Sequence, residues 1–167
     1  MHILVVDDSP ANTSSAYWTL PGHNLTVCGT VEEACQALGF RPGAPAVSPS
    51  HLFDAVLTDL WMPMPLVEHS KLLGVYFGRK QIEGSLSPVG LVFALRALNL
   101  GVRFIAILTD SDHHSDSLVT LMDLIDGQLS GNTPVVVGKY EKRWFECGRN
   151  GPKDWGKLLA RIMEEGK

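Results

Sequence analysis

The residues best suited to chemistry in this chain are acids that directly follow short apolar runs. Asp59 follows the run at residues 55–58 and precedes a proline-containing turn, and Asp7 and Asp8 follow the run at residues 3–6. An apolar run closed by turn formers is typical of a buried strand. Ligands of open parallel sheets bind at the carboxyl ends of the strands. We therefore expect these three carboxylates to share one edge of a sheet.

Two further polar residues follow apolar runs in the same way. Thr109 ends the run at residues 102–108, and Lys139 closes the run at residues 133–137. Clustered carboxylates repel one another and favour a bound cation, and all-oxygen ligands suit Mg²⁺. A hydroxyl and an ammonium suit the oxygens of a phosphoryl group, which an aspartate can accept covalently. The set predicts metal-assisted phosphoryl transfer to Asp59.

Each of these residues also has an ordinary structural interpretation. An acid after a strand is commonly a turn former or a helix cap, a threonine there commonly packs, and a lysine is commonly solvated. The prediction of a site rests on polar residues at the ends of four expected strands, and on no residue taken singly.

The elements that must position these side chains alternate along the whole chain. Strands are expected at residues 3–6, 24–28, 55–58, 102–108 and 133–137, with helices at residues 10–20, 30–38, 90–100, 115–127 and 155–163. Capping signals are Thr30 with Glu33, and Asp154. The apolar stripe of the helix at residues 90–100 is assigned to Leu91, Ala94, Leu95 and Leu98. Strand–helix alternation predicts an α/β fold with a parallel sheet covered on both faces.

Length and composition limit the possibilities. The 167 residues suit one domain, 1–167, with insertions near residues 39–50, 64–88 and 140–153. The hydrophobic share of 45% and the charged share of 19% are ordinary for a soluble protein, and the net charge of −4 argues against nucleic-acid binding. No basic leader or long apolar segment opens the chain, so we expect a cytoplasmic protein without a membrane anchor.

Taken in order, four segments resemble the receiver domain of two-component response regulators. They are Val-Val-Asp-Asp-Ser-Pro at residues 5–10, Leu-Thr-Asp-Leu-Trp-Met-Pro at 57–63, Ile-Leu-Thr at 107–109 and Val-Gly-Lys at 137–139. The resemblance spans about residues 1–164, and its strength lies in the ordered set. It implies a flavodoxin-like three-layer α/β/α sandwich whose five-stranded parallel sheet has the order 2-1-3-4-5.

The resemblance also implies a metal site. Asp8, Asp59 and the main-chain carbonyl of Trp61 would hold Mg²⁺, with Asp7 acting mainly through water. Asp59 would be the phosphoacceptor. A histidine kinase, a phosphotransfer protein or a small phosphodonor would supply the phosphoryl group.

The remaining roles implied by the resemblance concern the phosphoryl group. Thr109 would donate a hydrogen bond to it, and Lys139 would pair with its oxygens. The protein would be a stand-alone receiver that signals through protein contacts to an unknown output protein. Its catalysis would be limited to self-phosphorylation and autodephosphorylation, without turnover of an external substrate.

Four features depart from the receiver pattern. Asp110 replaces the small residue that usually follows the threonine, Tyr140 replaces the proline that usually follows the lysine, and Val136 stands where an aromatic residue is common. Without proline, a cis peptide at Tyr140 would cost about 2.5–4 kcal/mol, so a trans bond is expected. Residues 64–87 form an insertion on the rim of the site.

Two alternatives remain open. One is a receiver-like interaction module that keeps the pocket and signals without phosphorylation, an alternative suggested by Val136 and the rim insertion. The other is a hydrolase of the haloacid dehalogenase type, whose phosphatases need a second aspartate two residues after the nucleophile. Trp61 occupies that position, which argues against a hydrolase.

Overall fold

The structure is a computed structural model, and it describes residues 1–40, 53–63, 86–109, 118, 135–139 and 151–165. For residues 135–139 it describes the backbone alone. Most of the three expected insertions lies outside these residues, namely those at 39–50, 64–88 and 140–153. Also outside them are Asp110, Tyr140 and nearly all of the helix expected at 115–127. No helix in the described part of the chain has the length and apolarity needed to cross a membrane.

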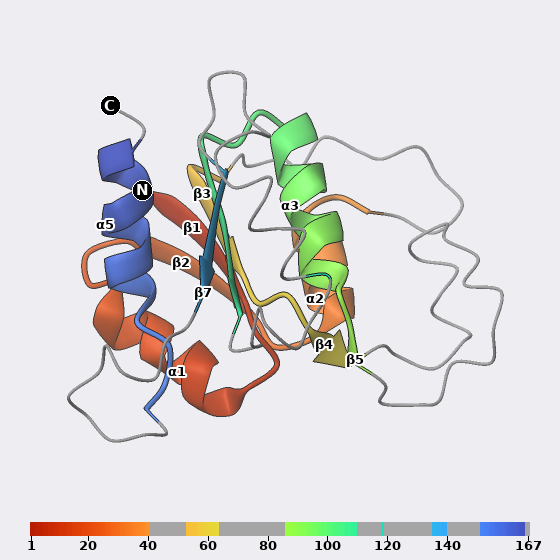
Figure 1. The fold of residues 1–167 in the computed structure, drawn as a ribbon, viewed down its shortest axis with the longest axis horizontal. Coiled ribbons are helices and arrows are strands. Elements are labelled where there is room, and N and C mark those ends of the chain that lie inside the picture. Colours follow the sequence, from red (N-terminus) through yellow and green to blue (C-terminus); the bar gives the residue numbers. More distant parts are fainter. Residues whose placement is uncertain (41–52, 64–85, 110–117, 119–134, 140–150, 166–167) are drawn as a thin grey trace, which may run out of the picture.

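A parallel sheet forms the centre of the fold (Figure 1). Its strands are β2 (Asn24–Cys28), β1 (His2–Val6), β3 (Ala55–Thr58) and β6 (Phe104–Thr109), adjacent in that order. The backbone of β7 (Val135–Lys139) pairs in parallel with β6. The sequence-based prediction of an α/β fold with a parallel sheet is therefore confirmed, and the order is compatible with a flavodoxin-like fold.

In the described part of the chain, helices cover both faces of the sheet (Figure 1). Helices α1 (Pro10–Thr19) and α5 (Trp155–Glu165) lie on one face, and α2 (Val31–Ala37) and α3 (Val89–Asn99) lie on the other. Both predicted caps are confirmed. Thr30 and Glu33 form a reciprocal capping box at α2, and Asp154 Oδ1 accepts a hydrogen bond of 3.0 Å from the amide of Lys157.

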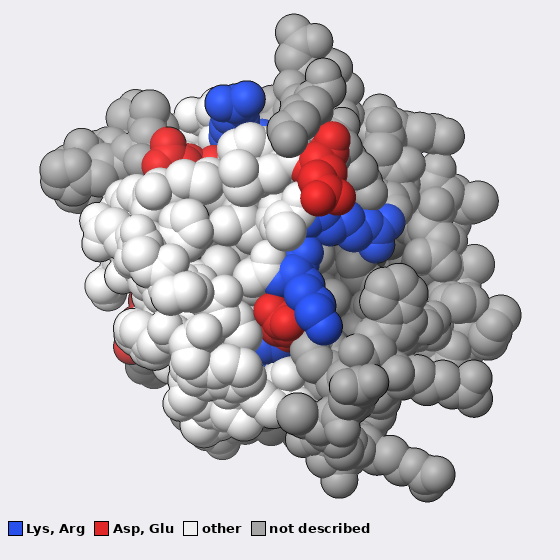
Figure 2. Space-filling view, turned by 90° about the vertical axis from the view of Figure 1, so that its left-hand side faces the viewer, with Lys and Arg blue, Asp and Glu red and all other residues white. Residues whose placement is uncertain are grey.

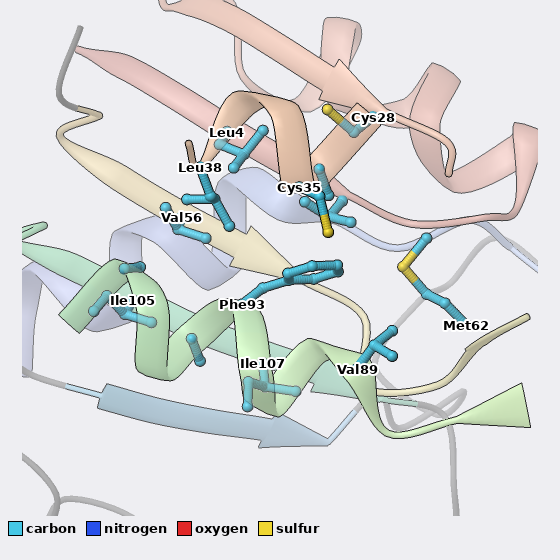
Figure 3. Close-up of a cluster of buried hydrophobic side chains, with 14 of the residues drawn as sticks. Leu4, Cys28, Cys35, Leu38, Val56, Met62, Val89, Phe93, Ile105 and Ile107 are labelled. Carbon is cyan, nitrogen blue, oxygen red and sulfur yellow. The ribbon is translucent and has the colours of Figure 1, made fainter. Parts of the chain in front are cut away.

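The strands divide their side chains between two buried clusters, as the period of two in a strand requires. Leu4 and Val6 of β1 pack with α2 and α3, whereas Ile3 and Val5 pack with α1 and α5. Figure 3 shows the first cluster, in which Phe93 of α3 reaches between the strands and α2. Because the central strands are buried on both sides, their carboxyl ends are fixed in position.

Two local predictions need correction. Leu95 is 43% exposed, and the buried stripe of α3 instead follows Val89, Phe93 and Ala97 at a spacing of four residues. The rest of the predicted stripe packs on the core, because Ala94 is buried and Leu91 and Leu98 are partly buried against the same cluster. Leu95 was misplaced because α3 is apolar on nearly all sides, so that hydrophobicity alone does not show which residues are most deeply buried. In addition, β4 (Met62–Pro63) and β5 (Leu86–Ser87) form a small antiparallel pair that joins the two ends of the rim insertion.

Candidate functional site

The acids predicted from the sequence meet at the carboxyl edge of the sheet. Asp7 follows β1 directly and Asp59 follows β3 directly, and these two strands are neighbours. The Asp59 amide donates a hydrogen bond of 2.8 Å to the Val6 carbonyl. The pairing of β1 with β3 is therefore fixed up to the last residue of β1. One carboxylate oxygen each from Asp7, Asp8 and Asp59 lies within 4.8 Å of the others.

This acidic triad is close enough to bind a metal ion. Its donors are all carboxylate oxygens, which hard divalent cations prefer. Asp7 and Asp59 are buried, whereas Asp8 is partly exposed, so an ion can be bound from the solvent side. The residues present therefore fit a divalent cation, as the sequence predicted.

A lysine that the sequence analysis did not select completes the cluster. Lys153 Nζ lies 2.7 Å from Asp7 Oδ2 and 2.8 Å from Asp59 Oδ1, and Lys153 is only 2% exposed. Lys153 belongs to the segment that was interpreted as an insertion, and it stands immediately before the cap of α5. The available signal was Asp154, since a cap fixes where α5 begins and this helix covers the sheet beside the acids.

Charge and burial together shift the proton equilibria of the site. Burial raises the pKa of Asp59 to about 6; the Lys153 ammonium opposes this shift, and the Asp7 carboxylate adds to it. Burial alone would lower the pKa of Lys153, but the carboxylates of Asp59 and Asp7 outweigh burial and raise it. Lys153 is therefore a stable ammonium, shared between two acids that it neutralises only in part.

The turn that carries Asp59 is held by the start of α3. The Leu60 amide donates a hydrogen bond of 2.8 Å to Asp59 Oδ1, and the Gly90 amide donates one of 3.1 Å to the Leu60 carbonyl. A Cβ atom on Gly90 would lie 1.9 Å from the Asp59 carbonyl oxygen. Only glycine allows this approach, so Gly90 is a structural part of the site.

The structure gives fewer contacts for the remaining predicted site residues, Thr109, Lys139 and Trp61. Thr109 is fully buried at the end of β6, and the register pairs its Cα with that of Lys139 at the end of β7. The Lys139 side chain lies outside the described residues, so its predicted role stays a prediction. Trp61 packs partly buried against the cluster with α2 and α3, and the metal-binding role of its carbonyl also stays a prediction.

Comparisons with known proteins add no further information. No protein-family model matches the sequence, and no curated protein or solved structure matches the chain.

Proposed function

We propose that this protein is a response-regulator receiver that accepts a phosphoryl group on Asp59 with the help of Mg²⁺. The observation that carries the proposal is the contact of Asp59 with the Lys153 ammonium, beside Asp7 and Asp8. A phosphoacceptor needs this combination, because a transferred phosphoryl group brings negative charge into a site that is already acidic. The fold proposed with it is flavodoxin-like, with a five-stranded sheet in the order β2-β1-β3-β6-β7.

The chain's own residues supply positioning and charge. A carboxylate oxygen of Asp59 forms the new bond to phosphorus. The leaving atom, an imidazole nitrogen of a phosphohistidine donor or an oxygen of acetyl phosphate, departs with the electron pair of the broken bond. The Lys153 ammonium neutralises the phosphoryl oxygens, and the Thr109 hydroxyl donates a hydrogen bond to them. Asp7, Asp8, Asp59 and the Trp61 carbonyl would hold Mg²⁺, which would supply further positive charge when bound.

Lys153 takes the role that the sequence analysis gave to Lys139. The argument is geometric, since the ammonium of Lys153 already contacts the acceptor carboxylate at 2.8 Å. Lys139 ends a strand beside Thr109, and it remains the second candidate for the same role. Substituting the two lysines separately distinguishes between them.

The proposed partners are a histidine kinase or phosphotransfer protein, which donates the phosphoryl group, and an output protein, which responds to the signal. Two large side chains on α1 support signalling by protein contact, because Tyr17 is 65% exposed and Trp18 is 62% exposed. Helix α1 contains no charged residue. Figure 2 views the molecule from the side of α1 and α5; charged residues form a band down its middle, and the described surface to the left of this band is largely uncharged.

One observation favours a receiver-like module that signals without phosphorylation. Lys153 already places a positive charge between Asp7 and Asp59, so the pocket is partly neutralised without a metal. Beryllofluoride, a phosphoryl mimic, separates the two functions. A phosphoacceptor binds it in a calorimetric titration only when Mg²⁺ is present, and Asp59→Asn abolishes the binding. Wild-type protein that binds neither Mg²⁺ nor beryllofluoride would leave the interaction module as the function.

A further inference from the structure

The main chain of Lys153 is held by side chains of α1. The Lys153 amide donates a hydrogen bond of 3.0 Å to Asn12 Oδ1, and the Lys153 carbonyl accepts one of 2.7 Å from Ser15 Oγ. Lys153 lies outside every strand, so no sheet hydrogen bonds fix its backbone. Its amide and carbonyl are therefore both bound by a helix far away in sequence.

Asn12 also contacts the acid that shares the ammonium. Its Nδ2 donates to both carboxylate oxygens of Asp7, at 3.0 and 3.1 Å. Its carbonyl accepts a hydrogen bond of 2.9 Å from Trp155 Nε1. It also lies 2.7 Å from Ser15 Oγ, whose single proton is shared between this carbonyl and that of Lys153. One residue thus connects Asp7, the backbone of Lys153 and the first residue of α5.

The contact between α1 and α5 is close at a second point. A Cβ atom on Gly156 would lie 2.1 Å from the Thr19 carbonyl oxygen, so the start of α5 lies directly on the last turn of α1. Trp155 is fully buried next to it. The two helices therefore pack closely at Trp155 and Gly156, directly after Lys153.

We propose that Asn12 and Ser15 are positioning residues that aim the Lys153 ammonium at Asp59. The reason is that Lys153 reaches the site from just before a helix, where these two side chains bind both its amide and its carbonyl. The inference rests on the proposed function for its effect on phosphoryl transfer, whereas the position of the ammonium can be tested without that function.

The test measures how well the Lys153 amine is protected in the folded protein. An amine-acylating reagent at low concentration modifies exposed lysines, and peptide mass spectrometry gives the ratio of Lys153 to Lys157 modification. Lys157 is the internal reference because its side chain is 67% exposed. The variants are Ser15→Ala and Asn12→Ala. Their matched controls are Ser14→Ala and Asn99→Ala, at exposed positions of α1 and α3.

The expected result is a rise of about tenfold in the Lys153:Lys157 ratio in Ser15→Ala, the effect of one lost buried hydrogen bond, and at least as large a rise in Asn12→Ala, which also loses the bonds to Asp7. Both controls should match the wild type. The rate of phosphorylation by acetyl phosphate at saturating Mg²⁺ should fall by at least about tenfold in the same two variants, because misplacing a charged group is costly. Circular dichroism on each variant confirms that the protein is folded.

The outcomes separate this inference from the proposed function. If the ratio stays within about twofold of the wild type in both folded variants, the inference is wrong, because one buried hydrogen bond is worth more than that. If the ratio rises while the phosphorylation rate is unchanged, the positioning role in phosphoryl transfer is wrong. If the wild type is not phosphorylated at all, the proposed function fails, and the acylation ratio still decides whether α1 holds the lysine. Should one variant fail to fold, the other gives the answer alone.

Discussion

The ammonium nitrogen of Lys153 lies 2.8 Å from Oδ1 of Asp59, although one residue precedes the last helix and the other follows the central strand. The same nitrogen lies 2.7 Å from Asp7 Oδ2. One positive charge is thus shared between two buried acids, with Asp8 close by. The stability of the protein and its proposed chemistry both depend on this arrangement, and each gives a separate prediction.

Lys153→Met should destabilise the protein at pH 7 in the absence of divalent cations by about 3–5 kcal/mol, the usual cost of removing one partner of a buried ion pair. The loss should be smaller at pH 5, where Asp59 takes up a proton. Added Mg²⁺ should recover part of it. Urea unfolding with and without Mg²⁺ measures all three effects.

Lys157→Met is the matched control, because Lys157 lies two residues into α5 and its side chain is 67% exposed and pairs with Asp154 at 3.9 Å. Its cost should stay below about 1 kcal/mol. A similar cost for both substitutions would show that the contacts of Lys153 contribute no special stability.

The two candidate lysines should differ in phosphoryl transfer. Lys153→Met should lower the initial rate of phosphorylation by acetyl phosphate by roughly 10²-fold, because the ammonium that neutralises the transferred group is lost. Lys139→Met should leave this rate within about threefold of the wild type. The reverse ranking, measured by quenched-flow or manual sampling and mass spectrometry, would restore the role first predicted for Lys139.

The raised pKa of Asp59, about 6 against an ordinary value of 3.8, has a defined effect on stability. Between about pH 4 and pH 6 the folded protein keeps a proton on Asp59 that the unfolded chain has released. This group's contribution to stability therefore decreases as the pH rises through that interval and is constant above it. The change amounts to about 3 kcal/mol at most.

Asp59→Asn isolates this contribution, because asparagine does not titrate. Without divalent cations, the variant should gain stability relative to the wild type as the pH rises from about 4 to 6, and the difference should then level off. Chemical unfolding across this range measures the difference. A difference that is constant with pH would mean that Asp59 has an ordinary pKa.

Gly90→Ala should destabilise the protein by roughly 1–3 kcal/mol, because the new methyl group would overlap the Asp59 carbonyl oxygen. Gly29→Ala is the control, since its Cβ would make only an ordinary contact of 3.9 Å with Glu33 Oε2. That change should stay within about 0.5 kcal/mol of the wild type. Thermal unfolding of both variants checks the comparison, and equal melting temperatures would contradict the close approach of α3 to the turn that carries Asp59.

Most of the fold could be predicted from local signals. Strand and helix positions follow from apolar runs and caps, as at Asn24–Cys28, where prediction and structure coincide, and at the capping box of Thr30 and Glu33. The acids could be predicted because each directly follows its strand. The β4–β5 pair could not, since two strands of two residues are too short to give an alternating pattern.

The cap at Asp154 shows where α5 begins, but no local signal shows that the lysine before it is buried. A lysine in a polar segment next to glycine and proline is usually solvated, and its burial here depends on Asn12 and Ser15, which lie at the other end of the chain. Such a contact depends on how α1 and α5 pack together, and helical periodicity carries no information on that packing. Leu95 of α3 was misplaced for a related reason, because tertiary packing selects the buried residues when a helix is apolar on nearly all sides.

The most direct test of the central claim is the intact mass of the protein after incubation with acetyl phosphate and Mg²⁺. The wild type should gain the mass of one phosphoryl group, lose it again on treatment with hydroxylamine as an acyl phosphate does, and gain nothing when EDTA replaces Mg²⁺. Asp59→Asn should stay unmodified under all conditions. Wild-type protein that keeps its mass in the presence of Mg²⁺, or an Asp59→Asn variant that is modified equally well, would contradict the assignment of Asp59 as the phosphoacceptor.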